Sequence, residues 1–174
     1  MIYRLLIVAL CVLAMAGCTR QKPAEKTNEM PPLVNIDRIL IEKKAHRMTL
    51  LSQGKALRSY QIALGEGGLE PKLREGDKRT PEGRYFIEGR NPDSSYFRSL
   101  RLSYPNARDR AFAADRGAPP GSDIMIHGIK NGYGWMGAAH REIDWTQGCI
   151  AVTNEEMTEI WDGVADGTLV EILP

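Results

Sequence analysis

The chain has 174 residues, and its 23 Lys and Arg against 22 Asp and Glu give a formal net charge of +1 at pH 7. This length suits one domain with additional segments. The near-neutral balance argues against a nucleic-acid partner, which normally requires a basic excess, and no repeat of about 20–50 residues is visible.

The first 17 residues predict a signal peptide of the lipoprotein type. Arg4 precedes the apolar run Leu5–Ala16, which is too short to span a bilayer comfortably. The segment has the charged start, apolar middle and small end of a secretory signal. Its end, Ala16-Gly17-Cys18, resembles a bacterial lipobox, which implies lipidation of Cys18. A plain signal peptide cut near Gly17 is the alternative.

Residues 18–32 then predict the lipidated cysteine followed by a flexible linker, because the stretch is polar, carries three prolines and lacks apolar periodicity. The lipobox resemblance implies a lipid-anchored protein on the periplasmic face of the cell envelope. Thr19, in place of an aspartate, favours the outer membrane over the inner one. The folded domain is expected at 33–174. Cys149 is its only cysteine, so no disulfide can form within it.

The first half of this domain predicts a β-meander. Apolar and polar residues alternate in Arg38–Lys44 and His46–Leu51, a turn is expected at Ser52–Lys55, and a further strand begins at Ala56. Gly65–Gly76 is rich in glycine and charge and is expected to form a loop.

The second half predicts short strands separated by irregular segments. In chain order these are a turn at Pro81–Gly83, strands at Arg84–Glu88 and Leu100–Tyr104, a long irregular loop at Asn106–Ser122, a strand at Asp123–Ile126 and a surface lid at Ile129–Trp145.

The end of the domain predicts one helix and a closing strand. Thr153 and Glu156 fit a capping box, so a helix should begin after Thr153 and reach about Asp162. Its buried side is expected to carry Met157, Ile160 and Trp161. A strand is expected at Thr168–Leu173. The whole pattern predicts a mainly β domain, sandwich or barrel-like, with one or two short helices.

Cys149 is the candidate nucleophile. A reactive cysteine needs a base or a positive field nearby. His127 ends a predicted strand and could serve as the base or simply pack there. His140 lies nine residues before Cys149 and could approach the thiol, bind substrate or face solvent, whereas His46 is expected on the surface of a strand. Zinc held by His127, His140 and Cys149 is a further alternative, although the sequence lacks the close-spaced ligand pairs of many zinc sites.

Two glycines support a nucleophilic cysteine. Gly148 would let the backbone amides of Gln147, Gly148 and Cys149 approach and stabilise an oxyanion. The carbonyl of Gly128 could accept a hydrogen bond from one ring nitrogen of His127 and so fix its tautomer without a carboxylate.

These residues together resemble the L,D-transpeptidase catalytic domain family, the YkuD-type fold. In that family a His-Gly pair is followed, after a gap, by Ser/Thr-His-Gly-Cys. Here His127-Gly128 is followed by the 17 residues Ile129–Trp145 and then by Thr146-Gln147-Gly148-Cys149. Thr80-Pro81-Glu82-Gly83 matches a second family feature, a Thr-Pro-x-Gly turn before a strand. The resemblance spans roughly residues 34–174.

Two positions depart from the family pattern. Gln147 replaces a histidine, and glutamine can orient groups by hydrogen bonding but cannot take a proton. Ala151 replaces a polar residue, commonly arginine or asparagine, and Arg141 could compensate for it in holding the substrate. These departures place the chain in a divergent, YafK-like branch of the family.

The resemblance implies an acyl-transfer enzyme of the cell envelope. Cys149 would attack the carbonyl at the L-centre of meso-diaminopimelate in a peptidoglycan tetrapeptide stem, with His127 as proton acceptor and donor and D-alanine as the leaving group. A second amine would take the acyl group, which makes a 3-3 cross-link or attaches a protein. Trp135, His140 and Arg141 would contact substrate from the lid. No metal or organic cofactor is implied.

Two alternatives stay open. With water as acceptor, the same fold would act as an L,D-hydrolase or carboxypeptidase, or would release a wall-linked lipoprotein. In a different class of function, the chain would be a non-catalytic lipoprotein that binds peptidoglycan. The implied partners in every case are peptidoglycan stem peptides and, through the lipid anchor, a membrane.

Overall fold

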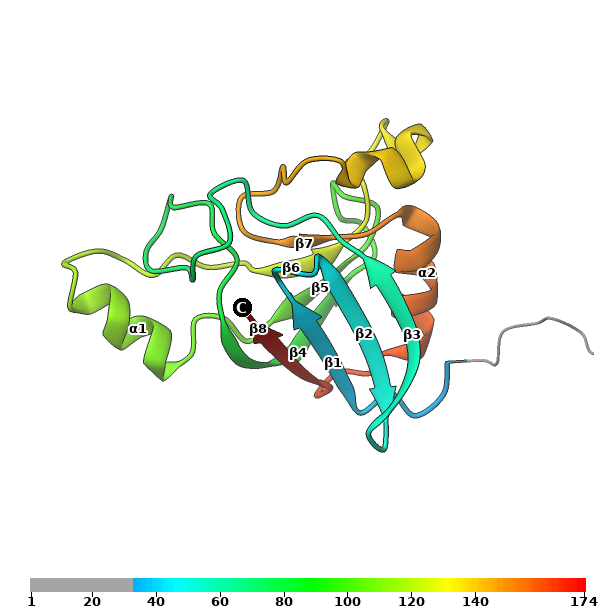
Figure 1. Ribbon diagram of the computed structural model, residues 1–174, viewed down its shortest axis with the longest axis horizontal. Coiled ribbons are helices and arrows are strands. Elements are labelled where there is room, and N and C mark those ends of the chain that lie inside the picture. The colour runs from blue at the N-terminus through cyan, green and yellow to red at the C-terminus, as the bar shows by residue number, and fades with distance from the viewer. Residues whose placement is uncertain (1–32) are drawn as a thin grey trace, which may run out of the picture. The chain divides into compact units, whose positions relative to one another are not determined.

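The computed structural model describes residues 33–174; the predicted signal peptide, the lipidated Cys18 and the linker lie outside these residues. The described part is built on one curled, half-barrel sheet of eight strands (Figure 1). In chain order the elements are β1 (Arg38–Glu42), β2 (Arg47–Ser52), β3 (Lys55–Gln61), β4 (Gly83–Asn91), β5 (Ser99–Leu102), α1 (Ala107–Ala114), β6 (Met125–His127), the 3₁₀ helix η1 (Gly134–Arg141), β7 (Ile150–Ala151), α2 (Asn154–Gly163) and β8 (Leu169–Leu173). The predicted mainly β fold with short helices is confirmed.

The first three strands form the predicted antiparallel meander. β1 pairs with β2, and β2 pairs with β3. The β2–β3 turn places Gln53 at φ 50° and Gly54 at φ 76°. Two successive positive φ angles are the geometry of a type I′ turn, whose twist matches that of the flanking strands. The turn therefore fixes the register of the hairpin.

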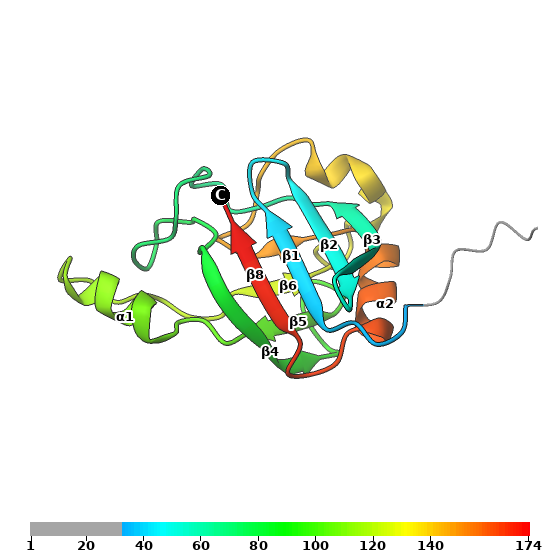
Figure 2. The ribbon, with the colours of Figure 1, turned by 60° about the horizontal axis from the view of Figure 1, so that its bottom comes forward.

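The last strand lies in the middle of the sheet (Figure 2). β8 pairs in parallel with β1 on one side and antiparallel with β4 on the other. Val170 and Ile172 of β8 are buried opposite Ile39 and Ile41 of β1. β8 thereby joins the meander to the second group of strands, β4 to β7.

Helix α2 packs against the core and begins at the predicted cap. The Thr153 hydroxyl accepts a hydrogen bond from the Glu156 amide at 3.2 Å, and the Glu156 carboxylate accepts one from the Thr153 amide at 2.9 Å. Met157 and Ile160 are fully buried, and Trp161 is partly buried against the core, as expected. Each fully buried apolar side chain of this size stabilises the fold by about 1.5–3 kcal/mol. α2 thus anchors β7, the strand that directly precedes it.

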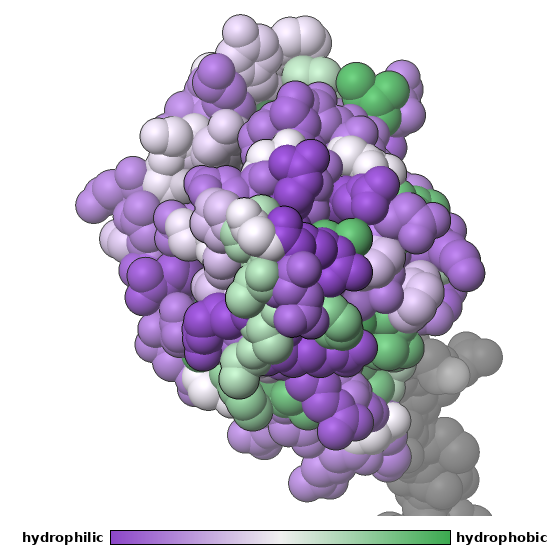
Figure 3. Space-filling view, turned by 90° about the vertical axis from the view of Figure 1, so that its left-hand side faces the viewer, coloured by the Kyte–Doolittle hydropathy of each residue, from purple (hydrophilic) through white to green (hydrophobic). Residues whose placement is uncertain are grey.

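The prediction of a long irregular loop at Asn106–Ser122 is wrong in part, because helix α1 occupies the first half of this segment. Asn106 caps α1 through a capping box with Asp109. Only Ala113 of the helix is buried, so α1 has no apolar stripe to reveal it in the sequence. The side of the molecule that carries α1 is mostly hydrophilic (Figure 3). Neither α1 nor any other helix within residues 33–174 is long and apolar enough to cross a membrane.

The prediction that His46 lies in a strand is wrong: it lies in the turn before β2. Its φ of 44° belongs to the left-handed region that strands do not use. Its Nε2 lies 2.9 Å from the Asp144 carboxylate, and the other Asp144 oxygen accepts the Leu64 amide at 2.8 Å. His46 therefore contributes to holding the segment that leads to Cys149.

Candidate active site

Cys149 and His127 open into the same cleft. β6 and β7 pair in parallel, with Ile126 opposite Ile150 and His127 opposite Ala151. Cys149, the residue before β7, therefore lies beside the strand that ends in His127. The cleft has a volume of about 390 Å³. Its lining includes the predicted site residues His127, Thr146, Gln147 and Cys149, and also Tyr96, Ser99, Asp123 and Trp145, which the sequence analysis did not single out as site residues.

The hydrogen bond expected between His127 and Gly128 is present, with Nδ1 2.7 Å from the Gly128 carbonyl oxygen. A carbonyl oxygen only accepts, so Nδ1 carries the proton and Nε2 keeps its lone pair. His127 as a whole residue is 4% exposed. Burial lowers the pKa of His127 to about 4; the Gly128 carbonyl opposes this shift and His140 adds to it. The imidazole is therefore neutral near pH 7, in the tautomer that a base requires.

The Cys149 thiol is also neutral at rest. Its Sγ lies 3.5 Å from the carbonyl oxygen of Asp123. Burial raises the pKa of the thiol, the Met125 amide and the charge of Lys72 lower it, and the charge of Asp123 raises it. Because the thiolate is the nucleophilic form, attack from this site requires a base to take the thiol proton.

Thr146 shapes the turn that carries the cysteine. Its hydroxyl donates to the Cys149 carbonyl at 2.7 Å and accepts from the Gly148 amide at 3.1 Å. Gly148 has a φ of 122°, and a Cβ there would lie 2.7 Å from the Arg79 carbonyl oxygen, so only glycine fits. Because Thr146 already engages the Gly148 amide, the expected oxyanion donors reduce to the amides of Gln147 and Cys149.

Gln147 links the cysteine turn to the loop 65–80. Its side-chain amide donates to the Glu66 carboxylate at 3.1 Å, and the Glu66 amide donates to the Thr146 carbonyl at 3.0 Å. Lys78 pairs with the same carboxylate. The hydrogen bonds from Lys78 and, to a smaller extent, from Gln147 hold the pKa of Glu66 below its usual value. Gln147 therefore acts in this structure as a tie between two loops, a role that needs no proton transfer.

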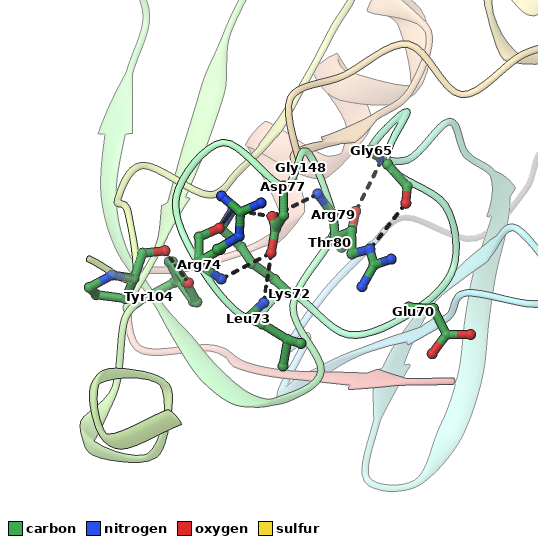
Figure 4. A network of polar contacts seen from close by, with 12 residues as sticks. Gly65, Glu70, Lys72, Leu73, Arg74, Asp77, Arg79, Thr80, Tyr104 and Gly148 are labelled. Atoms are coloured by element: carbon green, nitrogen blue, oxygen red, sulfur yellow. Dashed lines mark hydrogen bonds and ion pairs between the residues drawn. The ribbon is translucent and has the colours of Figure 1, made fainter. Parts of the chain in front are cut away.

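The loop 65–80 is itself held by Asp77 (Figure 4). The Asp77 carboxylate accepts hydrogen bonds from the amides of Leu73, Arg74 and Arg79 at 2.7–3.1 Å and from Lys72 Nζ at 2.8 Å. These bonds to the charged form outweigh the effect of burial and lower the pKa of Asp77. Gly148 lies next to this loop, so Asp77 indirectly fixes one wall of the cysteine turn.

The three lid residues expected to contact substrate lie away from the cleft. Trp135 of η1 is 81% exposed. Arg141 binds the Gln61 carbonyl at 2.6 Å and the Glu156 carboxylate at 3.2 Å, so it is not free to replace the polar residue missing at Ala151. His140 is buried and lines a separate, mostly apolar hollow of about 370 Å³.

Two aromatic residues that the sequence analysis did not single out flank the imidazole. The ring of Tyr96 lies 4.7 Å from that of His127, centroid to centroid, and Trp145 meets the imidazole edge-on at 5.7 Å. Trp145 also stacks on Tyr96 at 6.0 Å and donates from Nε1 to His140 Nδ1 at 3.3 Å. Trp145 directly precedes the cysteine motif, and this position in the sequence could have marked it as a site residue. Tyr96 comes from a distant loop, and no sequence signal marks it.

The zinc alternative gains no support from the geometry. Within the described range 33–174, no group of three or more His, Cys, Asp or Glu side chains is arranged to hold a metal ion. Nδ1 of His127 bonds to the Gly128 carbonyl, whereas Nδ1 of His140 accepts from Trp145. The two imidazoles therefore do not direct these nitrogens toward a common ligand position.

Comparison with known proteins agrees with this geometry. The model of the YkuD family, the L,D-transpeptidase catalytic domain, matches residues 36–172. The Escherichia coli K12 protein named "Putative L,D-transpeptidase YafK" is 36% identical over 121 residues, which cover 68% of this chain and 41% of that protein. The chain thus spans less than half the length of that relative.

Solved structures show the same fold. The helical cell shape determining protein Pgp2 of Campylobacter jejuni (K307A mutant) is 27% identical, with a TM-score of 0.59 over 80% of this chain and 47% of that one. The L,D-transpeptidase of Xylanimonas cellulosilytica, at 19% identity, gives a TM-score of 0.53 over 82% and 63% of the two chains. With the family model covering residues 36–172, the chain belongs to the L,D-transpeptidase catalytic domain family.

Proposed function

We propose that this protein is a cysteine acyltransferase of the cell envelope that acts on peptidoglycan stem peptides, with Cys149 as nucleophile and His127 as base. The observation that carries the proposal is the fixed tautomer of His127. Its Nδ1–H is held by the Gly128 carbonyl at 2.7 Å, so the ring nitrogen able to accept a proton belongs to a residue that lines the same cleft as the Cys149 thiol.

The chemistry follows in two stages. Nε2 of His127 takes the thiol proton while Sγ attacks the carbonyl at the L-centre of the diaminopimelate residue, and the C–N bond to D-alanine breaks as His127 returns the proton to the leaving amine. A second amine then attacks the thioester, loses a proton to His127 and receives the acyl group, which frees the thiol. The amides of Gln147 and Cys149 are the proposed donors to the oxyanion in both stages.

The lipid anchor at Cys18 is part of the proposal for location. It would keep the domain, through the linker 18–32, at the periplasmic face of the envelope, with the outer membrane favoured by Thr19. Mass spectrometry of the protein purified from the membrane fraction tests this, because lipidation adds mass to a peptide that begins at Cys18. An unlipidated N-terminus at another residue would contradict it.

The decisive experiment incubates the purified protein with tetrapeptide muropeptides, with and without an added amine acceptor, and follows the products by mass spectrometry. A dimer with loss of D-alanine indicates transpeptidation, whereas loss of D-alanine without a dimer indicates that water is the acceptor. Cys149→Ala should abolish both products and His127→Gln should reduce them by at least about 10²-fold. Turnover that survives Cys149→Ala would contradict the mechanism, and no turnover by the intact protein would favour a binding role.

A further inference from the structure

Residues of β4, β5 and β6 line up with Cys149, the residue before β7, across the open face of the sheet. Gly89 of β4 pairs with Arg101 of β5, and Arg101 pairs with Met125 of β6. The parallel register of β6 and β7 places Cys149 next in this row, beside Met125. In the neighbouring row, Asn91 pairs with Ser99 and Ser99 with His127. Neighbouring strands lie about 4.8 Å apart, so the Cα atoms of Arg101 and Cys149 lie roughly 10 Å apart along the row.

The cleft of Cys149 continues along these rows. A second hollow of about 260 Å³ is lined by Gly89, Arg90 and Arg101 and shares Asn91, Ser99, Asp123 and Met125 with the cleft. The two hollows therefore form one trough that runs from the thiol across β6 and β5 to β4. At the far end the Arg101 guanidinium lies over Gly89, where an added Cβ would be 3.6 Å from it.

The trough carries one available cation and one anion. Arg90 is committed elsewhere, because it donates to the carbonyls of Trp161 and Val164 and pairs with Asp166. Arg101 pairs only with Glu88 among the ion pairs of residues 33–174, at 3.3 Å, and both side chains are about half exposed. An exposed pair of this kind is worth little, so the guanidinium can exchange partners at small cost.

The anion is Asp123, which borders both hollows and lies close to the thiol. Its carbonyl oxygen is 3.5 Å from Cys149 Sγ, and its carboxylate, bonded to the Ser122 hydroxyl at 3.1 Å, is exposed. An anionic ligand alone would meet repulsion from Asp123, and a cationic one repulsion from Arg101. A group that carries both charges fits the trough.

We infer that Arg101 and Asp123 bind the zwitterionic end of a diamino acid in the acyl donor, with Arg101 on its carboxylate and Asp123 on its ammonium group. This rests on the proposed function, because the donor's L-centre carbonyl must sit at Cys149 while its side chain extends along the trough. Three methylene groups separate the two centres of diaminopimelate, and the flexible arginine side chain covers the remaining distance. Ala151 supplies no charge, and Arg141 is tied to Glu156, so Arg101 takes the role that Arg141 was expected to fill.

The test compares three synthetic tetrapeptides: one with a free zwitterionic end, one with that carboxylate amidated and one with that amine acetylated. The intact protein should prefer the free peptide over each modified one by about tenfold or more in kcat/KM, as expected for loss of a charge-assisted hydrogen bond. Arg101→Gln should remove the preference over the amidated peptide, and Asp123→Asn the preference over the acetylated one. Ratios are compared because Asp123 also affects the thiol itself.

Arg84→Gln is the matched control, since Arg84 is an arginine of β4 outside the trough that pairs with Glu171; its preferences should equal those of the unchanged protein. Dissociation constants of the same peptides on Cys149→Ala protein give a reading without chemistry. Turnover or binding with no preference, no binding of any peptide, or a preference that Arg101→Gln leaves intact would overturn the inference. Preference in binding without turnover by the intact protein would support it and contradict the proposed function instead.

Discussion

The side-chain amide of Gln147 donates to the carboxylate of Glu66 at 3.1 Å. The residue before Gly148 thus ties the cysteine turn to a neighbouring loop, and a glutamine side chain cannot take up a proton there as a histidine can. Both side chains are exposed, and hydrogen bonds between exposed groups contribute little to stability.

Gln147→Ala should therefore leave the reactivity of the thiol almost unchanged. We expect the pH profile of Cys149 alkylation, measured with iodoacetamide and mass spectrometry of the Cys149 peptide, to match that of the unchanged protein. His127→Gln, by contrast, should slow alkylation near pH 7, because the variant lacks the proposed base for the thiol proton. Equal shifts in the two variants would assign Gln147 a part in the chemistry.

Gly148→Ala should destabilise the protein strongly. The new Cβ would lie 2.7 Å from the Arg79 carbonyl oxygen at a φ of 122°, so both the clash and the backbone strain oppose it. We expect a loss of about 2–4 kcal/mol in the free energy of unfolding, measured by urea denaturation. Gly132→Ala is the control, since its φ of 87° is also positive but nothing lies within 4 Å of the added atom; a loss of about 1 kcal/mol is expected. Similar losses in both would mean that the contact with Arg79 is unimportant.

Stability should fall as the pH drops from about 6.5 to about 4. Burial lowers the pKa of both His127 and His140 to about 4, whereas both titrate near 6.5 in the unfolded chain. In this window the unfolded state binds protons that the folded state does not, so acid favours unfolding, by up to about 3 kcal/mol for each histidine. Urea denaturation at pH 7, 5.5 and 4.5 measures the slope.

Between pH 7 and 5.5, His140→Phe should flatten this slope by about half, because one of the two buried histidines is removed, whereas Glu66 and Asp77, whose pKa values are lowered, contribute only at lower pH. Within the described residues, Nε2 of His140 has no hydrogen-bond partner, so at pH 7 the substitution removes one unsatisfied atom but leaves the Trp145 Nε1–H without its acceptor, and the net cost should be about 1 kcal/mol. His46→Gln serves as the control at a more exposed histidine. An unchanged slope in His140→Phe would contradict the assignment.

Asp77→Ala should release the loop 65–80. Three backbone amides and Lys72 would lose their common acceptor, and each unsatisfied group costs about 1–3 kcal/mol if it stays buried. We expect faster hydrogen exchange at the amides of Leu73, Arg74 and Arg79, and slower turnover, because the wall beside Gly148 loosens. Asp162→Ala, at an exposed position on α2, should change neither. Exchange that stays slow in Asp77→Ala would show that the loop is held by other contacts.

The parts of the structure that were predictable from the sequence depend on neighbours in the chain. The capping box of Thr153 and Glu156 and the bond from His127 to Gly128 each join residues at most three positions apart, so local chemistry specifies them. Helix α1 was not predicted, because its mostly exposed residues show no periodic apolar pattern. The placement of Tyr96 against His127 and the pairing of Arg141 with Glu156 depend on the tertiary fold, which no local pattern encodes.

The position of β8 limits the order in which the sheet can be completed. The strand that joins the two halves of the sheet, β1 to β3 and β4 to β7, follows all of them in the chain. Until β8 is in place the two halves lack their shared neighbour, and the elements that carry Cys149 and His127 belong to an unfinished core. We therefore expect the thiol–imidazole pair to be fully assembled only once β8 has joined the two halves of the sheet.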